Sequence, residues 1–330
     1  MEYRNLGAAG VKVSPLCLGT MMFGRWGNPN HAEVVRIIHR ALDAGINFID
    51  TANVYSHGEA EEILGRALAG RRHQVVLATK VWGAMGHGPN ERGLSRRAIQ
   101  EQCEASLRRL GTDVIDLYQI HRSDPEVPWE ETLSALTDLV RQGKVRYIGC
   151  STNDRPAQGQ PRLPAWEIVE TLALSERRGF ERFASLQPPY SLLRRTVETE
   201  YLPMCQRHGL GVMVWSPLEG GFLTGKYRRG QPNPEDSPRA VQWVGDTTEP
   251  RFEPRLAAVE AFAGIAAELG AGLAEAAIAW TLLHPAVTST IIGPRTPAQL
   301  EGCLRALEVS FTPEALARID EIVPPETSVL

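Results

Sequence analysis

Three ionisable residues stand at the ends of apolar segments that are typical of buried strands. Asp50 ends NFID, Lys80 ends VVLATK and His121 ends VIDLYQIH, while Tyr55 follows Asp50 by five positions. Singly, each residue has a structural explanation, as a helix cap, an ion-pair partner or a satisfied core histidine. Because the carboxyl ends of consecutive parallel strands share one rim, we expect the three side chains to lie together and to share a chemical task.

The four side chains suit the reduction of an aldehyde or ketone. A tyrosine hydroxyl has a pKa of about 10 and is a poor acid at neutral pH. An ammonium such as that of Lys80 stabilises the phenolate, which lowers the pKa and makes Tyr55 a usable proton donor. Asp50 would keep Lys80 charged and oriented, and His121 could hydrogen-bond the carbonyl oxygen. The set offers no nucleophile, so we expect a separate hydride donor.

A metal site is not predicted. Metal-dependent barrel hydrolases usually carry a His-x-His pair on the first strand, and LCLGT contains no histidine. The remaining histidines are scattered without the spacing of metal ligands. We therefore expect no bound metal.

The alternation of apolar and helical segments predicts the elements that position these residues. Strands that are apolar on both faces and separated by single helices are typical of parallel βαβ units, and eight such units close a (β/α)8 TIM barrel. The predicted strands are Leu16–Thr20, Asn47–Asp50, Val75–Lys80, Val114–His121, Val145–Ser151, Phe183–Gln187, Gly211–Ser216 and Thr288–Gly293. The predicted helices are His31–Ala44, Glu61–Ala69, Ser95–Leu110, Trp129–Gln142, Pro164–Arg178, Thr196–His208, Leu273–His284 and Thr296–Leu307.

Further segments are predicted to surround this barrel. Tyr3–Leu6 and Val11–Val13 indicate an N-terminal β-hairpin, and Pro254–Leu269 and Pro313–Ile322 indicate extra helices towards the C-terminus. No repeat or low-complexity linker divides the chain, so we expect residues 1–330 to form a single domain. Three long loops follow strands and are expected on the catalytic face: Gly83–Leu94, Thr152–Leu163 and Pro217–Glu253.

The charge and cysteine content exclude several classes of protein. The 35 basic and 39 acidic residues give a net charge of −4, without the basic excess that nucleic-acid binding or a polybasic membrane anchor requires. The five cysteines are spread widely without CxxC pairs, which argues against a disulfide framework and favours a reducing compartment. No signal-like or membrane-spanning apolar run is present. We expect a cytoplasmic enzyme whose partner is a small-molecule carbonyl substrate.

Several segments, in order, are similar to motifs of the aldo-keto reductase superfamily and together cover nearly the whole chain. GINFIDTANVYSHGEAEEILGRAL contains Asp50 and the catalytic tyrosine position Tyr55, while ATK and YQIHR supply the family's lysine and histidine. The resemblance implies a (β/α)8 barrel, NADP(H) as cofactor and hydride transfer to a carbonyl. The other similar segments are GKVRYIGCSTN (143–153), SLQPPYSLL (185–193), VMVWSPLEGGFLTGKY (212–227) and IIGPRTPAQLEGCL (291–304).

The same resemblance implies the residues that hold the cofactor. Their chemistry is suitable, since Trp215 offers a flat apolar face, Lys226 brings a positive charge, and Arg295 near a helix N-terminus favours a 2′-phosphate and hence NADPH over NADH. No GxGxxG motif follows a strand, so a Rossmann fold is not expected. The expected cofactor residues are Gly19, Thr20, Met21, Asp50, Ser151, Thr152, Asn153, Gln187, Trp215, Ser216, Pro217, Leu218, Gly220, Gly221, Lys226, Gly293, Arg295 and Gln299.

Two positions depart from the family pattern. The family's serine and asparagine are usually contiguous, whereas here Thr152 separates Ser151 from Asn153, which leaves the second carboxamide contact open between Thr152 and Asn153. Gly302-Cys303 replaces the usual Glu-Asn that grips the adenine. We expect weaker adenine binding there, or its replacement by Gln299.

Substrate choice remains open between alternatives. Trp26, Tyr55, Trp82 and His121 are expected to line the substrate pocket, together with GTMMFG and the segment Val241–Trp243, and such walls favour aromatic or medium-chain aldehydes. RGLSRRAI and QPPYSLL also resemble branches that reduce nucleotide-linked keto-sugars. A different alternative is a β subunit of a potassium channel, which binds NADPH to regulate a partner. In that branch the position of His121 is commonly asparagine, so the intact tetrad favours a reductase.

Overall fold

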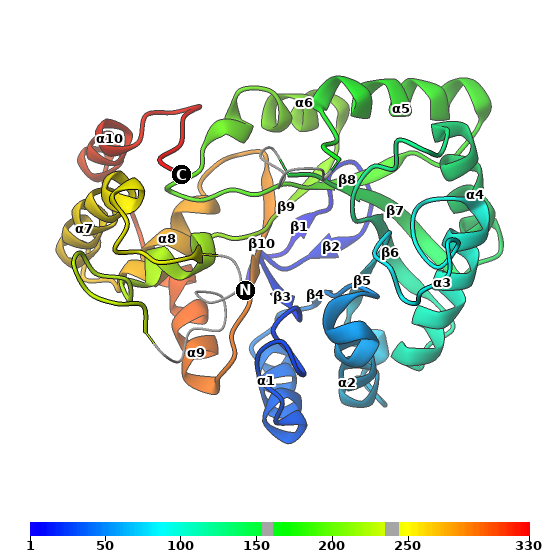
Figure 1. The fold of residues 1–330 in the computed structure, drawn as a ribbon, viewed down its shortest axis with the longest axis horizontal. Helices are drawn as coiled ribbons and strands as arrows, with labels where there is room; N and C mark the ends of the chain where they lie inside the picture. Colours follow the sequence, from blue (N-terminus) through cyan, green and yellow to red (C-terminus); the bar gives the residue numbers. More distant parts are fainter. Residues whose placement is uncertain (154–160, 235–243) are drawn as a thin grey trace.

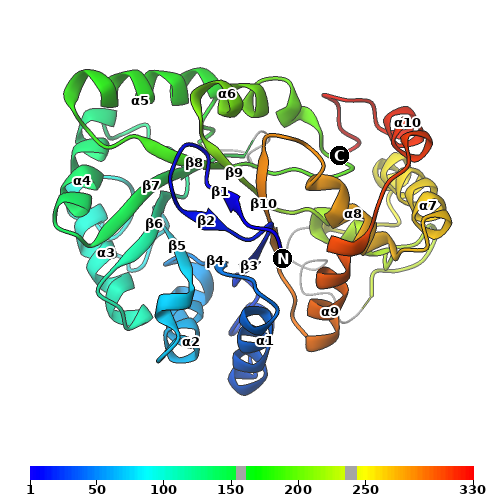
Figure 2. The same ribbon diagram turned by 180° about the vertical axis from the view of Figure 1, so that it is seen from behind.

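Eight parallel strands close a barrel in the order β10-β3-β4-β5-β6-β7-β8-β9, with helices around it (Figures 1 and 2). The structure is a computed structural model and describes residues 1–153, 161–234 and 244–330. The predicted (β/α)8 barrel is thereby confirmed. The barrel strands are β3 (Leu16–Gly19), β4 (Phe48–Asp50), β5 (Val76–Val81), β6 (Ile115–Ile120), β7 (Val145–Ser151), β8 (Phe183–Gln187), β9 (Gly211–Val214) and β10 (Val287–Ile292).

Capping residues in the sequence set where the surrounding helices begin and end. The Ser95 hydroxyl accepts a hydrogen bond from the Ala98 N–H at 3.2 Å, and Gly111 ends the same helix in the left-handed conformation. The barrel helices are α1 (His31–Asp43), α2 (Glu59–Ala67), α3 (Arg96–Leu110), α4 (Trp129–Arg141), α5 (Ala165–Arg178), α6 (Tyr201–His208), α8 (Leu273–Thr281) and α9 (Pro297–Arg305). The predicted extra helices α7 (Glu253–Glu268) and α10 (Pro313–Ile322) lie side by side at one edge (Figure 1).

The predicted helix Thr196–His208 is wrong over its first half. Thr196–Glu198 form the 3-10 turn η3, and the α-helix begins only at Tyr201. Pro203 explains the break, because its ring excludes the carbonyl of Thr199 from a regular helical turn, whereas proline is tolerated within the first turn of a helix. The helix can therefore begin just before Pro203 but cannot run through it from Thr196.

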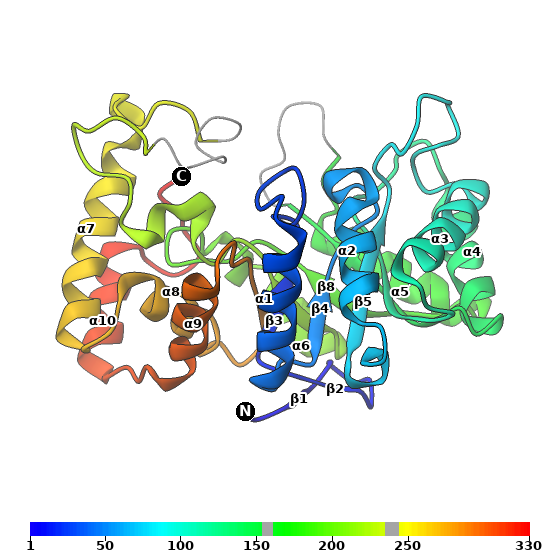
Figure 3. The ribbon, with the colours of Figure 1, turned by 90° about the horizontal axis from the view of Figure 1, so that it is seen from below.

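The N-terminal hairpin closes the end of the barrel opposite the long loops. Strands β1 (Arg4–Asn5) and β2 (Lys12–Val13) pair antiparallel, and Leu6 and Val13 pack with the side chains that fill the lower barrel. Gly7 lies so close to the strand β9 that a Cβ would stand 2.2 Å from the Gly211 nitrogen, which only glycine avoids. Figure 3 shows the hairpin below the barrel and the loop between β5 and α3 above it. The upper mouth is therefore the open end.

Two further predictions concern a loop and the membrane. The predicted pocket segment Val241–Trp243 lies outside the described residues. Among the residues that the structure describes, no single helix is long and apolar enough to cross a membrane. Only a pair bent by 92°, Pro250–Glu268 with α8, reaches that length and composition together, and its apolar side chains, including Phe262 and Trp280, are buried in the core.

Candidate active site

The four expected catalytic residues come together at the upper mouth of the barrel. Asp50 is the last residue of β4, Lys80 precedes the last residue of β5, and His121 directly follows β6. In the parallel register Asp50 is opposite Ala78 and Lys80 is opposite Gln119, and the His121 N–H donates to the Val81 carbonyl at 2.9 Å. The strand ends therefore place the side chains on one rim.

A sharp turn after β4 carries Tyr55 back over the mouth. Tyr55 begins the short helix η1 (Tyr55–Gly58), in which Ser56 (φ 48°) and His57 (φ 56°) adopt the left-handed conformation before Gly58 (φ 93°). Such conformations cost about 1 to 3 kcal/mol each for residues other than glycine. The buried Ser56 hydroxyl donates to the Phe23 carbonyl at 3.0 Å and helps to hold the turn. The strain is thus located where the tyrosine is positioned.

Lys80 connects the aspartate and the tyrosine. Its fully buried Nζ donates to Asp50 Oδ2 at 2.5 Å, to the Thr51 carbonyl at 2.8 Å and to Tyr55 Oη at 3.1 Å. Burial alone would lower the pKa of Lys80, but the Asp50 carboxylate and Tyr55 outweigh it and raise that pKa above its usual value. The lysine is therefore a cation, and a cation at this distance favours the phenolate form of Tyr55.

Two glutamines complete the hydrogen bonding of the buried carboxylate. Asp50 Oδ1 accepts from Gln119 Nε2 at 3.0 Å and from Gln187 Nε2 at 2.9 Å, and Gln187 Nε2 also lies 3.2 Å from Gln119 Oε1. Gln187 was expected to contact the cofactor carboxamide, and here its amide nitrogen contacts Asp50. Gln119 was missed, although a polar residue two positions before His121 in an apolar strand shares the inward face of that histidine.

His121 is positioned to donate a hydrogen bond beside the tyrosine. Its ring is perpendicular to that of Tyr55, with centroids 5.8 Å apart. Burial, followed by the charges of Lys80 and Arg122, lowers the pKa of His121 well below its usual value. The imidazole is therefore neutral at physiological pH, and its N–H can donate to a carbonyl oxygen held near Tyr55 Oη.

The low pKa of His121 predicts a measurable pH dependence of stability. The native state keeps this histidine neutral, while the unfolded chain binds a proton below about pH 6.5, so stability should fall as the pH falls from about 6.5 towards 5. One such proton changes the free energy of unfolding by at most about 1.4 kcal/mol per pH unit. Urea unfolding between pH 5 and 7.5 should show a shallower slope for His121→Asn. The pKa of His284 is also lowered, by burial, but it contributes equally to both proteins. Identical slopes would contradict the assignment.

The two candidates for the second carboxamide contact, Thr152 and Asn153, follow Ser151 at the end of β7. Ser151 ends β7, and its hydroxyl donates to the Gln187 carbonyl at 2.9 Å, which leaves its oxygen able to accept from an amide. The buried Thr152 hydroxyl donates to the Leu163 carbonyl at 2.7 Å and thereby holds the loop. Asn153, the other candidate for the second contact, is half-buried.

The segment after β9 forms a turn suited to an anion. Trp215 is half-buried, and its Nε1 donates to the Thr152 carbonyl at 3.3 Å, which fixes the indole at the mouth. The following residues Ser216 (φ 57°), Gly220 (φ 65°) and Gly221 (φ 99°) are left-handed, and the turn between them contains Pro217 and Leu218. Successive turns of this kind can direct backbone N–H groups at a phosphate.

Lys226 lies over this turn. A Cβ at Gly221 would stand 2.7 Å from Lys226 Cε and 3.0 Å from its Nζ, so the glycine provides the room that the lysine occupies. The lysine Nζ is also 5.0 Å from the centre of the Tyr227 ring. The structure thus brings the predicted glycines and the predicted cation together, and this donor set fits a pyrophosphate.

Arg295 occupies the loop between β10 and α9, with Gly293 before it. Its N–H donates to Gln299 Oε1 at 2.7 Å, and its carbonyl accepts from Asn28 Nδ2 at 2.7 Å. Gln299 therefore helps to shape the loop around Arg295. In the place of the usual Glu-Asn pair, Gly302 has no side chain and Cys303 is buried against the core, so neither offers a group for the adenine.

Gly19, Thr20 and Met21 lie at the end of β3, next to the tetrad. A Cβ at Gly19 would come within 2.6 Å of the Ile291 side chain, which explains the glycine. The Thr20 N–H donates to the Asp50 carbonyl at 2.9 Å, while its buried hydroxyl has no hydrogen-bond partner within the described part of the chain. Such a hydroxyl beside the mouth is consistent with a bound cofactor.

The expected substrate residues lie on the same side as Tyr55 and His121. The Trp26 ring lies 6.3 Å from that of Tyr55 and 6.2 Å from that of the exposed His57. Trp82 directly follows β5 and is half-buried. The rings of Trp26 and His121 therefore lie beside that of Tyr55, and the role of these residues in a substrate pocket stays a prediction.

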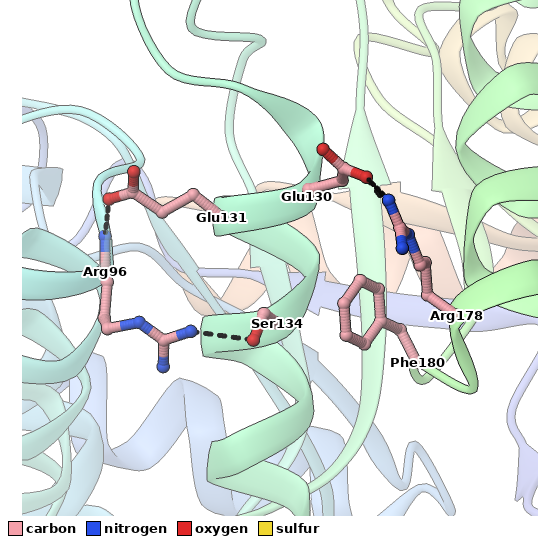
Figure 4. Close-up of a pocket in the computed structure, with 6 residues that line it drawn as sticks. All are labelled: Arg96, Glu130, Glu131, Ser134, Arg178 and Phe180. Atoms are coloured by element: carbon pink, nitrogen blue, oxygen red, sulfur yellow. Dashed lines mark hydrogen bonds and ion pairs between the residues drawn. The ribbon is translucent and has the colours of Figure 1, made fainter.

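Other polar clusters are satisfied internally. The surface cleft between α3, α4 and α5 (Figure 4) contains Arg178, which pairs with Glu130 at 2.5 Å, and Arg96, whose guanidinium pairs with Asp138. Its charges thus compensate one another and indicate no ligand. Over residues 1–153, 161–234 and 244–330, no group of three or more His, Cys, Asp or Glu could hold a metal ion.

Comparison with known proteins gives one consistent family. The model of the Aldo/keto reductase family matches residues 15–324. An uncharacterized oxidoreductase of Bacillus subtilis (strain 168) is 41% identical, over 98% of this chain and 96% of its own. A probable voltage-gated potassium channel subunit beta of Arabidopsis thaliana is 38% identical, over 98% of this chain and 97% of its own. Versiconal hemiacetal acetate reductase of Aspergillus parasiticus is 34% identical, over 99% and 98%.

Proposed function

The chain belongs to the aldo/keto reductase family, and we propose that it is an NADPH-dependent reductase of aldehydes and ketones. One observation carries this proposal: the buried Lys80 ammonium contacts both Asp50 and Tyr55, beside a neutral His121. When bound, the nicotinamide cofactor supplies the hydride. Ser151, Asn153 and Trp215 are the residues that would hold its nicotinamide end.

The chain's own residues orient the carbonyl group and supply the proton. His121 donates a hydrogen bond to the carbonyl oxygen and fixes it beside Tyr55 Oη. As the oxygen gains negative charge, the Tyr55 hydroxyl transfers its proton to it, and Lys80 stabilises the phenolate that remains. Asp50, held by Gln119 and Gln187, keeps the lysine in place.

The same residues also bear on the alternatives to carbonyl reduction. The similarity to probable channel β subunits supports a regulatory NADPH-binding role as the second candidate. The intact tetrad favours catalysis, since a protein that only binds the cofactor does not need a proton donor paired with a lysine. Reduction of nucleotide-linked keto-sugars, a single-domain organisation of residues 1–330 and a cytoplasmic location stay predictions from the sequence.

The proposal is tested by the oxidation of NADPH in the presence of carbonyl compounds. With 4-nitrobenzaldehyde and a varied carbonyl panel, we expect turnover with NADPH and much less with NADH. Arg295→Ala should raise the dissociation constant of NADPH about 10- to 100-fold and that of NADH less than about 3-fold, since a charge-assisted contact contributes about 1.5 to 3 kcal/mol. Tight NADPH binding without turnover on any carbonyl would refute the reductase, and equal changes for both cofactors would refute the role of Arg295.

A further inference from the structure

Two arginines lie against one aromatic ring beside the proposed proton donor. The guanidinium carbon of Arg92 is 5.9 Å from the centre of the Trp82 ring, and that of Arg122 is 6.0 Å from it. Trp82 directly follows β5 and Arg122 follows His121 at the end of β6, while Arg92 belongs to the loop after β5. We call these three residues the arginine–tryptophan cluster. The cluster lies at the mouth of the barrel, because Trp82 and Arg122 directly follow the strand ends that carry Lys80 and His121.

The positive charge of this cluster is not neutralised by a carboxylate. In the part of the chain that the structure describes, neither Arg92 nor Arg122 has an ion-pair or hydrogen-bond partner, whereas many other arginines do. The acidic residues next to the cluster are engaged elsewhere. Glu91 accepts from the Gly88 N–H at 2.6 Å, and Asp124 accepts from the Leu94 N–H at 2.9 Å. These two carboxylates hold the loop through its backbone, and within the described residues neither forms an ion pair with Arg92 or Arg122.

Arg122 lies beside the proposed catalytic residues, since it directly follows His121 at the end of β6. Arg122 is half-buried, and burial lowers its pKa while the nearby Tyr55 raises it. In turn, the charge of Arg122 lowers the pKa of His121. A partly desolvated cation without a counter-ion is costly, and an anion that binds to it is held more strongly than in water.

We propose that Arg92 and Arg122 bind an anionic substituent of the carbonyl substrate, a carboxylate or a phosphate, with Trp82 holding both guanidinium groups in place. The planar guanidinium donors match either anion, and the cation–π contacts with Trp82, near the outer limit of about 6 Å, restrict their freedom before binding. The inference rests on the proposed reductase activity and names its substrate class. The preferred substrates are aldehydes or ketones that carry an anionic group.

Matched substrates that differ only in charge test the proposal. We expect the wild-type kcat/KM for 4-carboxybenzaldehyde to exceed that for its neutral ester, methyl 4-formylbenzoate. Arg122→Gln and Arg92→Gln should lower kcat/KM for the acid about 10- to 100-fold, mainly through KM, and that for the ester less than about 3-fold. The exposed Arg108, in the last turn of α3, offers a matched control. Arg108→Gln removes the same charge and should leave both values unchanged.

A second pair of substrates distinguishes the two anions. If the cluster serves phosphates, glyceraldehyde 3-phosphate should be preferred over glyceraldehyde by a larger factor than the acid is over the ester. The opposite order identifies carboxylates. Absence of a charge preference in both pairs would overturn the proposal, and so would equal losses on charged and neutral substrates, because these indicate that Arg122 only supports Tyr55 or the fold. Arg92→Gln, in an exposed loop position, keeps the test valid if Arg122→Gln folds poorly.

A binding experiment separates this inference from the proposed function. Calorimetric titration of the NADPH-loaded protein with 4-carbamoylbenzoate, whose amide is not reduced, reports the anion site without turnover. We expect binding that weakens about 10-fold or more in Arg122→Gln and at higher salt, while the neutral methyl ester binds equally to both proteins. Binding with this pattern but no carbonyl turnover would refute the reductase and keep the anion site. Turnover with equal binding of acid and ester would do the reverse.

Discussion

Replacing Tyr55 with phenylalanine is expected to lower kcat for carbonyl reduction by about 10²- to 10⁴-fold, the usual contribution of a general acid. The substitution removes only the hydroxyl that Lys80 contacts at 3.1 Å, while the ring can keep its position against Trp26 and His121. The carbonyl oxygen would then have no proton donor at that place. Lys80 itself would keep Asp50 and the Thr51 carbonyl as partners, so the fold should persist.

The measurement combines steady-state kinetics with NADPH binding, followed by fluorescence titration. We expect the dissociation constant of NADPH to change less than about 3-fold, since none of the residues proposed to hold the cofactor lies on the η1 turn. Tyr3→Phe is a matched control, because the hydroxyl of Tyr3, next to the distant N-terminal hairpin, donates to the carbonyl of Gly45 in the loop after α1. If Tyr55→Phe retained most of its activity, the tyrosine could not be the acid.

The sequence was sufficient to predict the barrel because its physical signals agree. Runs such as VVLATK and VIDLYQIH are apolar on both faces, which only a doubly covered parallel strand requires, and the turn residues between them mark each unit. The convergence of Asp50, Tyr55, Lys80 and His121 could be predicted for the same reason. A lysine closing such a run has no structural use in the core unless a carboxylate is near, and Asp50 is the partner that the order of the strands supplies.

The features that escaped prediction depend on contacts between distant segments. The role of Gln119 follows from its distance to Asp50, which is 69 residues away along the chain. Of the two left-handed residues, His57 is of a type enriched in this conformation but Ser56 is not, so the local signal for the turn is weak. The arginine–tryptophan cluster similarly depends on how the loop before Leu94 folds back over β5. Such tertiary arrangements have no periodicity that a sequence pattern could carry.

Lys80→Met is expected to destabilise the protein by about 3 to 5 kcal/mol, the usual cost of a buried charge that loses its partner. The Asp50 carboxylate would keep the amide donors of Gln119 and Gln187 on Oδ1 but would lose the ammonium that contacts Oδ2 at 2.5 Å. Thermal and urea unfolding of the two proteins give the difference. A loss below about 1 kcal/mol would contradict the assignment of Asp50 and Lys80 as a buried ion pair.

The double variant Asp50→Asn/Lys80→Met shows why the pair is present. Removing both charges leaves no isolated ion in the core, and buried ion pairs replaced by neutral residues are often as stable as the original. We therefore expect the double variant to recover most of the lost stability, with a coupling energy of about 2 to 3 kcal/mol between the two sites. It should nevertheless show no carbonyl reduction, because the cation that stabilises the Tyr55 phenolate is gone. Strictly additive losses would contradict the coupling. Recovered stability without activity would mean that the charge is held in the barrel for proton transfer and not for the fold.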